Sequence, residues 1–160
     1  MTVTWRRSAL VFLAAGVTTL TGCDTLLGPR DNSVLRDQLA RGEAKWAEAA
    51  ASNYDVVVTR GPLYAEGHPT VALEVRDGVI VGGTYPDTGE PVEPFILDGH
   101  QTVPELFDLI RDALGRRVPA IAVSYDQELG FPREIIIDYD SFRIDDDLYV
   151  AVSDFAAVDP

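Results

Sequence analysis

The pair Asp77-Gly78 and the two apolar runs around it constrain the fold of this chain more than any other feature. The run Val71–Val75 alternates apolar with other side chains before the pair, and Val79-Ile80-Val81 follows directly. A two-residue type I′ turn needs positive φ at both central positions, which Asp-Gly provides at low cost. The pattern therefore predicts a β-hairpin and assigns this part of the chain to an antiparallel sheet.

Four further strands are predicted from the same two-residue alternation. Tyr54, Val56 and Val58 begin the first, and the other three occupy residues 121–125, 134–139 and 148–155. Strands that follow one another through short turns favour antiparallel pairing. The six runs therefore predict one antiparallel sheet of five to six strands.

Two amphipathic helices are predicted beside this sheet. The first covers about residues 34–51, where apolar or small residues recur at helical spacing and Trp46 is expected to anchor the helix on the sheet. The second begins with the capping box Thr102 to Glu105, continues through Leu114, and is expected to stop near Gly115. We therefore predict an α+β domain with two helices packed on one face of the sheet.

Residues 82–101 interrupt these patterns. The segment contains Pro86, Pro91 and Pro94 together with four acidic residues, and no apolar period continues through it. A long loop is predicted here, and loops of this length in compact domains are either functional or mobile.

The first 23 residues are typical of an exported, lipid-anchored bacterial protein. Arg6 and Arg7 precede an apolar run, residues 9–20, that suits a signal peptide and is too short to span a bilayer. The run ends in a sequence that resembles the lipobox, in which a diacylglyceryl group is attached to the cysteine and cleavage precedes it: Leu20, Thr21, Gly22 and Cys23. This resemblance implies a signal peptide over 1–22, a lipidated tether over 23–33 and a single domain over 34–160. The expected location is the outer face of the cytoplasmic membrane, or the periplasmic face where an outer membrane exists.

The net charge limits the kinds of partner that the predicted domain can bind. The whole chain has a net charge of −13, and residues 1–22 hold two basic and no acidic residues, so the remaining 138 carry −15. Such a surface repels the phosphate backbone of nucleic acids. Besides the membrane itself, we expect an envelope protein or a cationic ligand as partner, and no cofactor.

The residues typical of catalytic sites do not form a complete set in the sequence. His68 and His100 show no spacing typical of a zinc site, and no Gly-x-Ser-x-Gly element is present. The prediction is therefore a non-catalytic domain. The alternative is a hydrolase that uses carboxylates of the 82–101 loop and of a later strand, namely Glu90, Glu93, Asp98 and Asp138.

A second alternative is a calcium-stabilised domain. The acidic residues near the C-terminus offer oxygen ligands, although Arg143 and Tyr149 stand where an EF-hand counted from Asp138 needs glycine and an acid. The calcium candidates are Asp138, Asp140, Asp145 and Asp147, with Asp146 between the last two.

The order of several short motifs resembles the bacterial domain-of-unknown-function family 6174. The motifs are Trp46 eight residues before Tyr54, Val75-x-Asp77-Gly78, Thr102-Val103-x-x-Leu106-Phe107, and Tyr125-Asp126 followed by Gly130-Phe131-Pro132, Ile135 and Asp138. The resemblance implies a small exported domain, often a lipoprotein, without an established activity. The densest of these motifs supplies the candidate binding residues Tyr125, Asp126, Gly130, Phe131, Pro132 and Asp138.

Overall fold

The computed structural model describes residues 32–63, 67–143 and 147–159. The predicted signal peptide, the lipobox with Cys23 and most of the predicted tether lie outside these residues. Residues 32–160 form one compact unit. Within the described part, no helix has the length and apolar content needed to cross a membrane.

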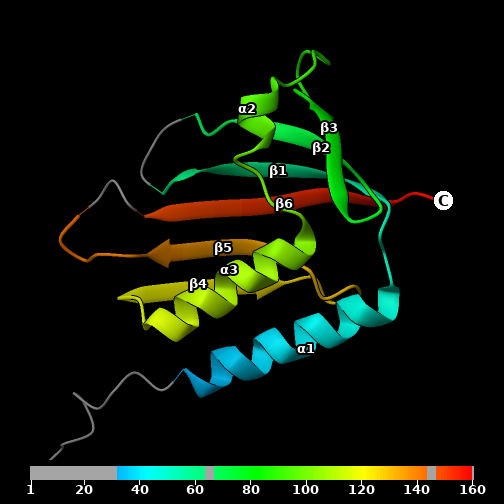
Figure 1. The fold of residues 1–160 in the computed structure, drawn as a ribbon. Helices are drawn as coiled ribbons and strands as arrows, with labels where there is room; N and C mark the ends of the chain where they lie inside the picture. The colour runs from blue at the N-terminus through cyan, green and yellow to red at the C-terminus, as the bar shows by residue number, and fades with distance from the viewer. Residues whose placement is uncertain (1–31, 64–66, 144–146, 160) are drawn as a thin grey trace, which may run out of the picture. The chain divides into compact units, whose positions relative to one another are not determined.

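A single six-stranded sheet forms the centre of this unit, and all its neighbouring strands are antiparallel. Figure 1 shows two three-stranded meanders, β1-β2-β3 and β4-β5-β6, joined side by side by the pairing of β1 with β6. The strand order is β3-β2-β1-β6-β5-β4, which confirms the predicted antiparallel α+β class. The strands are β1 (Tyr54–Pro62), β2 (Thr70–Arg76), β3 (Val79–Thr84), β4 (Ala120–Tyr125), β5 (Pro132–Asp138) and β6 (Leu148–Ala157).

The predicted hairpin joins β2 to β3. Asp77 and Gly78 have φ values of 51° and 75°, and Arg76 pairs directly with Val79. Both central residues therefore adopt the positive φ that a two-residue turn of this kind needs.

Within the described residues three helices accompany the sheet, one more than predicted. The two long helices, α1 (Ser33–Ala49) and α3 (Val103–Arg116), lie on the same side of the sheet in Figure 1. The additional helix, α2 (Pro94–Leu97), lies within the segment predicted as a loop, and β3 also extends into that segment as far as Thr84. That prediction was therefore wrong in part, because four residues are too few to show a helical apolar period.

The start of α3 matches the prediction, and its end lies one residue after the predicted Gly115. The side chain of Glu105 accepts a hydrogen bond from the backbone N–H of Thr102 at 2.7 Å, which completes the predicted capping box. The helix continues through Gly115, and the left-handed residue that ends it is Arg117, with φ of 56°. The glycine lies inside the helix because the turn comes two residues later.

Trp46 packs between α1 and the centre of the sheet, as predicted. Its indole is buried and meets the rings of Tyr54 and Phe155 edge-on, with centroids 5.5 Å and 5.6 Å apart. The Tyr54 hydroxyl in turn accepts a hydrogen bond from the backbone N–H of Val103 at 2.9 Å. One aromatic group thus connects α1, β1, β6 and the first turn of α3.

Candidate functional site

A groove of about 490 Å³ runs between α1 and the edge strand β4. One wall is a face of α1, and the other is β4 with the turn that follows it. We call this feature the α1–β4 groove. Its lining consists of Gln38, Arg41, Gly42, Lys45, Val123, Ser124, Tyr125, Asp126, Gln127 and Gly130.

Two glycines set the distance between the walls of the α1–β4 groove. A Cβ atom on Gly42 would lie only 2.8 Å from the carbonyl oxygen of Gly130 and 2.9 Å from the Tyr125 ring. Gly130 itself has φ of 79°, and a Cβ there would collide with the backbone of Gly42. Because neither residue has a side chain, the helix backbone touches the turn backbone and closes one end of the groove.

A compact turn holds the sheet-side wall in place. The Asp126 carboxylate accepts hydrogen bonds from the backbone N–H groups of Glu128 at 2.9 Å and Leu129 at 2.8 Å. The backbone N–H of Asp126 donates to the carbonyl of Phe131 at 2.8 Å. The charge of Asp126 is therefore partly used within the turn, which is the local bonding that Asp favours in turns.

Tyr125 forms part of the groove wall beneath α1. Its ring stacks with Phe107 at a centroid distance of 6.5 Å, and its hydroxyl is buried without a hydrogen-bond partner among the described residues. Burial, and secondarily the negative charge of Glu43, raise the pKa of Tyr125 to about 12. At neutral pH the phenol is therefore protonated, which suits it to donate a hydrogen bond and makes it a poor base or nucleophile.

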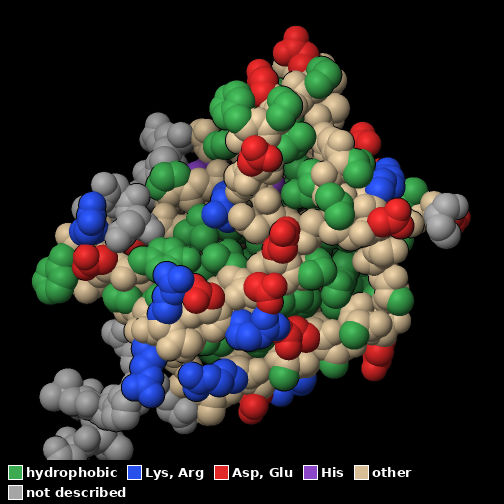
Figure 2. Space-filling model, viewed as in Figure 1, with side chains coloured by type: hydrophobic (Ala, Val, Ile, Leu, Met, Phe, Trp, Pro, Cys, Tyr) green, Lys and Arg blue, Asp and Glu red, His purple; other side chains and the backbone are tan. Residues whose placement is uncertain are grey.

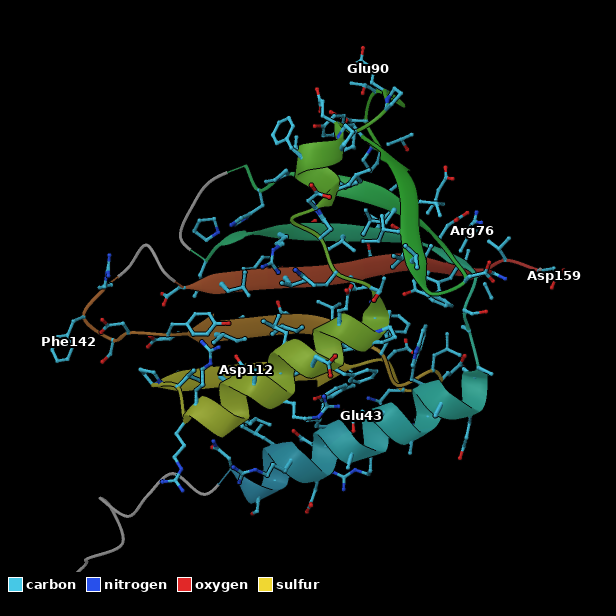
Figure 3. The ribbon with its side chains drawn as sticks, viewed as in Figure 1. Glu43, Arg76, Glu90, Asp112, Phe142 and Asp159 are labelled. Carbon is cyan, nitrogen blue, oxygen red and sulfur yellow. The ribbon has the colours of Figure 1, made fainter. Side chains whose placement is uncertain are left out.

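Positive charge dominates the helix wall of the α1–β4 groove. The Lys45 ammonium donates to the backbone carbonyl of Gln127, whereas Arg41 forms no ion pair with any described residue. Glu43, on the same helix, is paired with Arg111 of α3, and Figure 3 shows it on the side of α1 that faces α3. Figure 2 shows Lys and Arg side chains gathered over α1 and α3, although the whole chain has twice as many acidic as basic residues.

Of the six candidate binding residues, the structure brings three into this groove. Tyr125, Asp126 and Gly130 line it, and Phe131 and Pro132 are buried directly beside it. Asp138 lies at the opposite end of β5, about 20 Å farther along the strand. The motif therefore marks one wall of the groove and includes one residue that belongs elsewhere.

Asp138 lies far from the strand that precedes the other three carboxylates of the hydrolase alternative. Glu90, Glu93 and Asp98 follow β3, which is separated from the strand of Asp138 by four strand spacings, or about 19 Å. Figure 3 shows Glu90 at the outer tip of the segment after β3, and Glu93 accepts a hydrogen bond from the Tyr85 hydroxyl at 3.1 Å. Glycosidase chemistry needs two carboxyl groups within about 10 Å, so Asp138 is too far from β3 to form such a site with a carboxylate beside that strand.

The described calcium candidates lie near the connection between β5 and β6, where Ile137 pairs with Leu148, so Asp138 and Asp147 are at the same end of the two strands. The Asp140 carboxylate accepts a hydrogen bond from the backbone N–H of Phe142 at 3.0 Å, and Asp147 is buried at the start of β6. Asp145 lies outside the described residues. Among the residues described, no three His, Cys, Asp or Glu side chains are placed to hold a metal ion.

Sequence reasoning missed the helix wall of the groove, Gln38, Arg41, Gly42 and Lys45. The signal that would have found it is Gly42, because a glycine in a helix interior costs about 1 kcal/mol relative to alanine and is retained where another backbone approaches. Gly42 lies four residues before Trp46, which places it on the apolar stripe of the helix. The spacing does not say which strand that stripe faces.

The fold defines a class: a small α+β domain whose antiparallel sheet has two long helices on one side. The sequence matches the profile of DUF6174, a family of unknown function, over residues 38–157, so the chain belongs to that family. The match confirms the resemblance found in the motifs, and its span contains the whole α1–β4 groove. No curated protein and no solved structure matches the chain.

Proposed function

We propose that this protein is a lipid-anchored, non-catalytic binding domain on the outer face of a bacterial cytoplasmic membrane, or on the periplasmic face where an outer membrane exists. The anchoring is supported by the lipobox-like sequence Leu20-Thr21-Gly22-Cys23. Eight residues, 24–31, separate Cys23 from the described domain. An extended segment of that length spans at most about 30 Å. A domain tethered in this way recognises partners close to the bilayer.

The single observation that supports binding is the composition of the α1–β4 groove. Its described lining offers two side-chain amides, two cations and the backbone of an edge strand. Its one carboxylate, Asp126, already bonds to two backbone N–H groups of its own turn, and its phenol stays protonated at neutral pH. These groups hold a ligand by hydrogen bonds and charge, and this described lining has no histidine to activate the Ser124 hydroxyl as a nucleophile.

Among the expected partners, the groove favours an envelope protein over a cationic ligand. Arg41 and Lys45 line one wall, and like charges at close range oppose the binding of a cation. A protein segment can instead use the cations, the amides and the strand edge together.

Lipid attachment is tested by labelling cells that produce the full chain with radioactive palmitate. We expect the wild-type protein to carry the label and to sediment with membranes, and Cys23→Ser to lose both properties. Equal labelling, or equal membrane retention, of the two proteins would show that the sulfur of Cys23 is not the anchor.

Partner binding is tested by cross-linking at the native membrane followed by mass spectrometry. We expect the double variant Arg41→Ala, Lys45→Ala to lose the cross-linked partner. The matched control Arg111→Ala, Arg116→Ala removes the same charge from α3, outside the groove, and should retain it. Loss in both variants would mean that overall charge, and not this groove, mediates the association.

A further inference from the structure

We infer that the α1–β4 groove binds an extended, acidic segment of a partner protein, which joins the sheet as an additional strand beside β4. This inference rests on the proposed binding function and specifies its partner. It follows from three properties of the groove: a free strand edge, space for side chains, and the sign of the surrounding charge.

The free edge belongs to β4. The strand is last in the sheet order, and its only strand partner is β5. Among the described residues, no other backbone hydrogen bond reaches residues 120–124. In an antiparallel strand every second residue directs its N–H and C=O groups away from its partner, so these groups are available to another chain.

Nothing in the sequence of β4 opposes such pairing. The strand reads Ala-Ile-Ala-Val-Ser-Tyr, without a charge, a proline or a glycine. Proteins commonly protect an edge strand with lysine, proline or a covering segment. An unprotected edge that is also one wall of a groove is the arrangement used for peptide recognition by strand addition.

The second property is the space opposite this edge. An added strand would lie about 4.8 Å from β4, with successive side chains pointing to opposite faces of the sheet. Side chains on the helix side would enter the groove of about 490 Å³ and approach Gln38, Arg41 and Lys45. Those on the other side would lie along Ala122 and Ser124, which are small and exposed.

The third property is charge, and it selects an acidic partner. Among the described residues Arg41 has no ion pair, and the Lys45 ammonium bonds to a neutral carbonyl. Asp126 is held within its turn. Surface charges act mainly within about 8 Å at physiological salt, so these local cations outweigh the distant acidic surface. A second copy fits less well, because two-fold pairing of β4 strands would bring two such cationic walls together.

The inference is tested with the full-length protein in detergent micelles and a fluorescent, end-capped hexapeptide of alternating glutamate and valine, which matches the six residues of β4. Fluorescence anisotropy compares it with a lysine-valine peptide of the same length. Two further versions are N-methylated, one at the glutamates and one at the valines. Because successive N–H groups in a strand face opposite edges, only one of these versions should lose binding.

We expect the glutamate peptide to bind and the lysine peptide to bind about tenfold more weakly or less. Arg41→Ala, Lys45→Ala should weaken the glutamate peptide by about tenfold, whereas Arg111→Ala, Arg116→Ala should leave it unchanged. Hydrogen exchange should slow at residues 120–125 when the peptide is added. The loss of binding in one N-methylated peptide and the slowed exchange of the β4 amides would then report the same strand pairing.

Three results would overturn the inference: equal binding of both charge types, full binding of both N-methylated versions, or exchange protection confined to another strand. Protection of β4 by self-association without peptide would assign the edge to a second copy and would equally overturn it. If any of these results is obtained while Cys23 is still labelled with palmitate, only strand addition is rejected. The membrane anchor of the proposed function is then retained.

Discussion

The two edges of the sheet differ in what covers them. At the β3 edge the chain folds back on itself: Thr84 forms a bridge with Pro91, and the N–H of Val92 bonds to the carbonyl of Gly83 at 2.9 Å. Helix α2 then packs against the same strand. At the β4 edge no described segment pairs with the strand, and α1 runs alongside to leave a groove.

The composition of the two edge strands does not explain this difference. Neither β3 (Val-Ile-Val-Gly-Gly-Thr) nor β4 contains a charged residue or a proline. The segment that follows each strand determines whether the outer edge of that strand is covered. After β3 a proline-rich stretch returns along the outer edge, whereas after β4 the Asp126 turn leads into β5 on the inner edge. In this sheet, the outer edge of β3 is therefore covered by the segment that follows it, and the outer edge of β4 is not covered in that way.

The largest expected effect is on the free energy of unfolding, and it compares α1, beside the β4 edge, with α2, beside the β3 edge. Trp46→Ala should lower the free energy of unfolding by about 4 kcal/mol, because it removes a buried indole that joins α1 to the sheet. Phe95→Ala in α2 should change it by less than about 0.5 kcal/mol, because that ring is 73 % exposed. Urea unfolding of both variants checks this, and equal losses would mean that α1 is not anchored through Trp46.

The second-largest expected effect is also on the free energy of unfolding, and it compares two glycines in turns near the two edges. Gly130 and Gly89 have similar positive φ values, 79° and 72°, but only Gly130 is pressed against another backbone. Gly89→Ala should cost about 1 kcal/mol from backbone strain alone, and Gly130→Ala about 3 kcal/mol because a clash with α1 is added. If urea midpoints shift equally, the close approach of α1 to the turn is not rigid.

A pH-dependent effect concerns Tyr125. Its folded-state pKa of about 12 exceeds the usual value of 10.0, so the folded chain holds this proton more tightly than the unfolded chain does. The resulting stabilisation is complete below about pH 10 and is lost as the pH rises towards about 12. Tyr125→Phe should therefore flatten the fall in unfolding free energy across that range, since phenylalanine has no proton to release.

The control for this titration is Tyr85→Phe at the β3 edge. Burial and a hydrogen bond to Glu93 also raise the pKa of Tyr85, but its hydroxyl bond is exposed and solvent screens its charge. We expect a smaller change in the alkaline stability profile, measured by urea unfolding at a series of pH values. A larger change for Tyr85→Phe would contradict the assignment to the buried phenol.

The smallest expected effect concerns the charge beside the Tyr125 phenol. Glu43 contributes to the raised pKa of Tyr125, so Glu43→Gln should lower that pKa towards its usual value. Asp112→Asn, which removes a carboxylate of α3 paired with Arg116, serves as the charge-matched control and should leave it unchanged. Because Asp112 also raises the pKa of Tyr139, the difference is measured by an NMR titration of the assigned Tyr125 ring in the two variants.

The sequence was sufficient for those parts of the fold that depend on local patterns. The Asp77-Gly78 turn, the Thr102 capping box and the burial of Trp46 all follow from residues within a few positions of one another. Helix α2 and the left-handed conformation of Arg117, which follows the last residue of α3, were not predicted. In those two places a four-residue turn and a non-glycine left-handed residue depend on tertiary packing more than on local preference.

The candidate site was only half predictable for a related reason. The motif from Tyr125 to Gly130 appears as one continuous stretch, and it forms one wall of the groove. The other wall comes from Arg41 and Lys45, more than seventy residues earlier. Their position opposite β4 depends on how α1 crosses the sheet, which helical spacing alone does not specify.

The central pairing of the sheet has a consequence for folding. Strand β6 lies between β1 and β5, and its register places Ala157 opposite Tyr54, so the two meanders are joined by residues far apart in the sequence. Closing so long a loop carries a high entropic cost before its contacts form. The pairing of β1 with β6 is therefore expected to form late, after the hairpins within each meander.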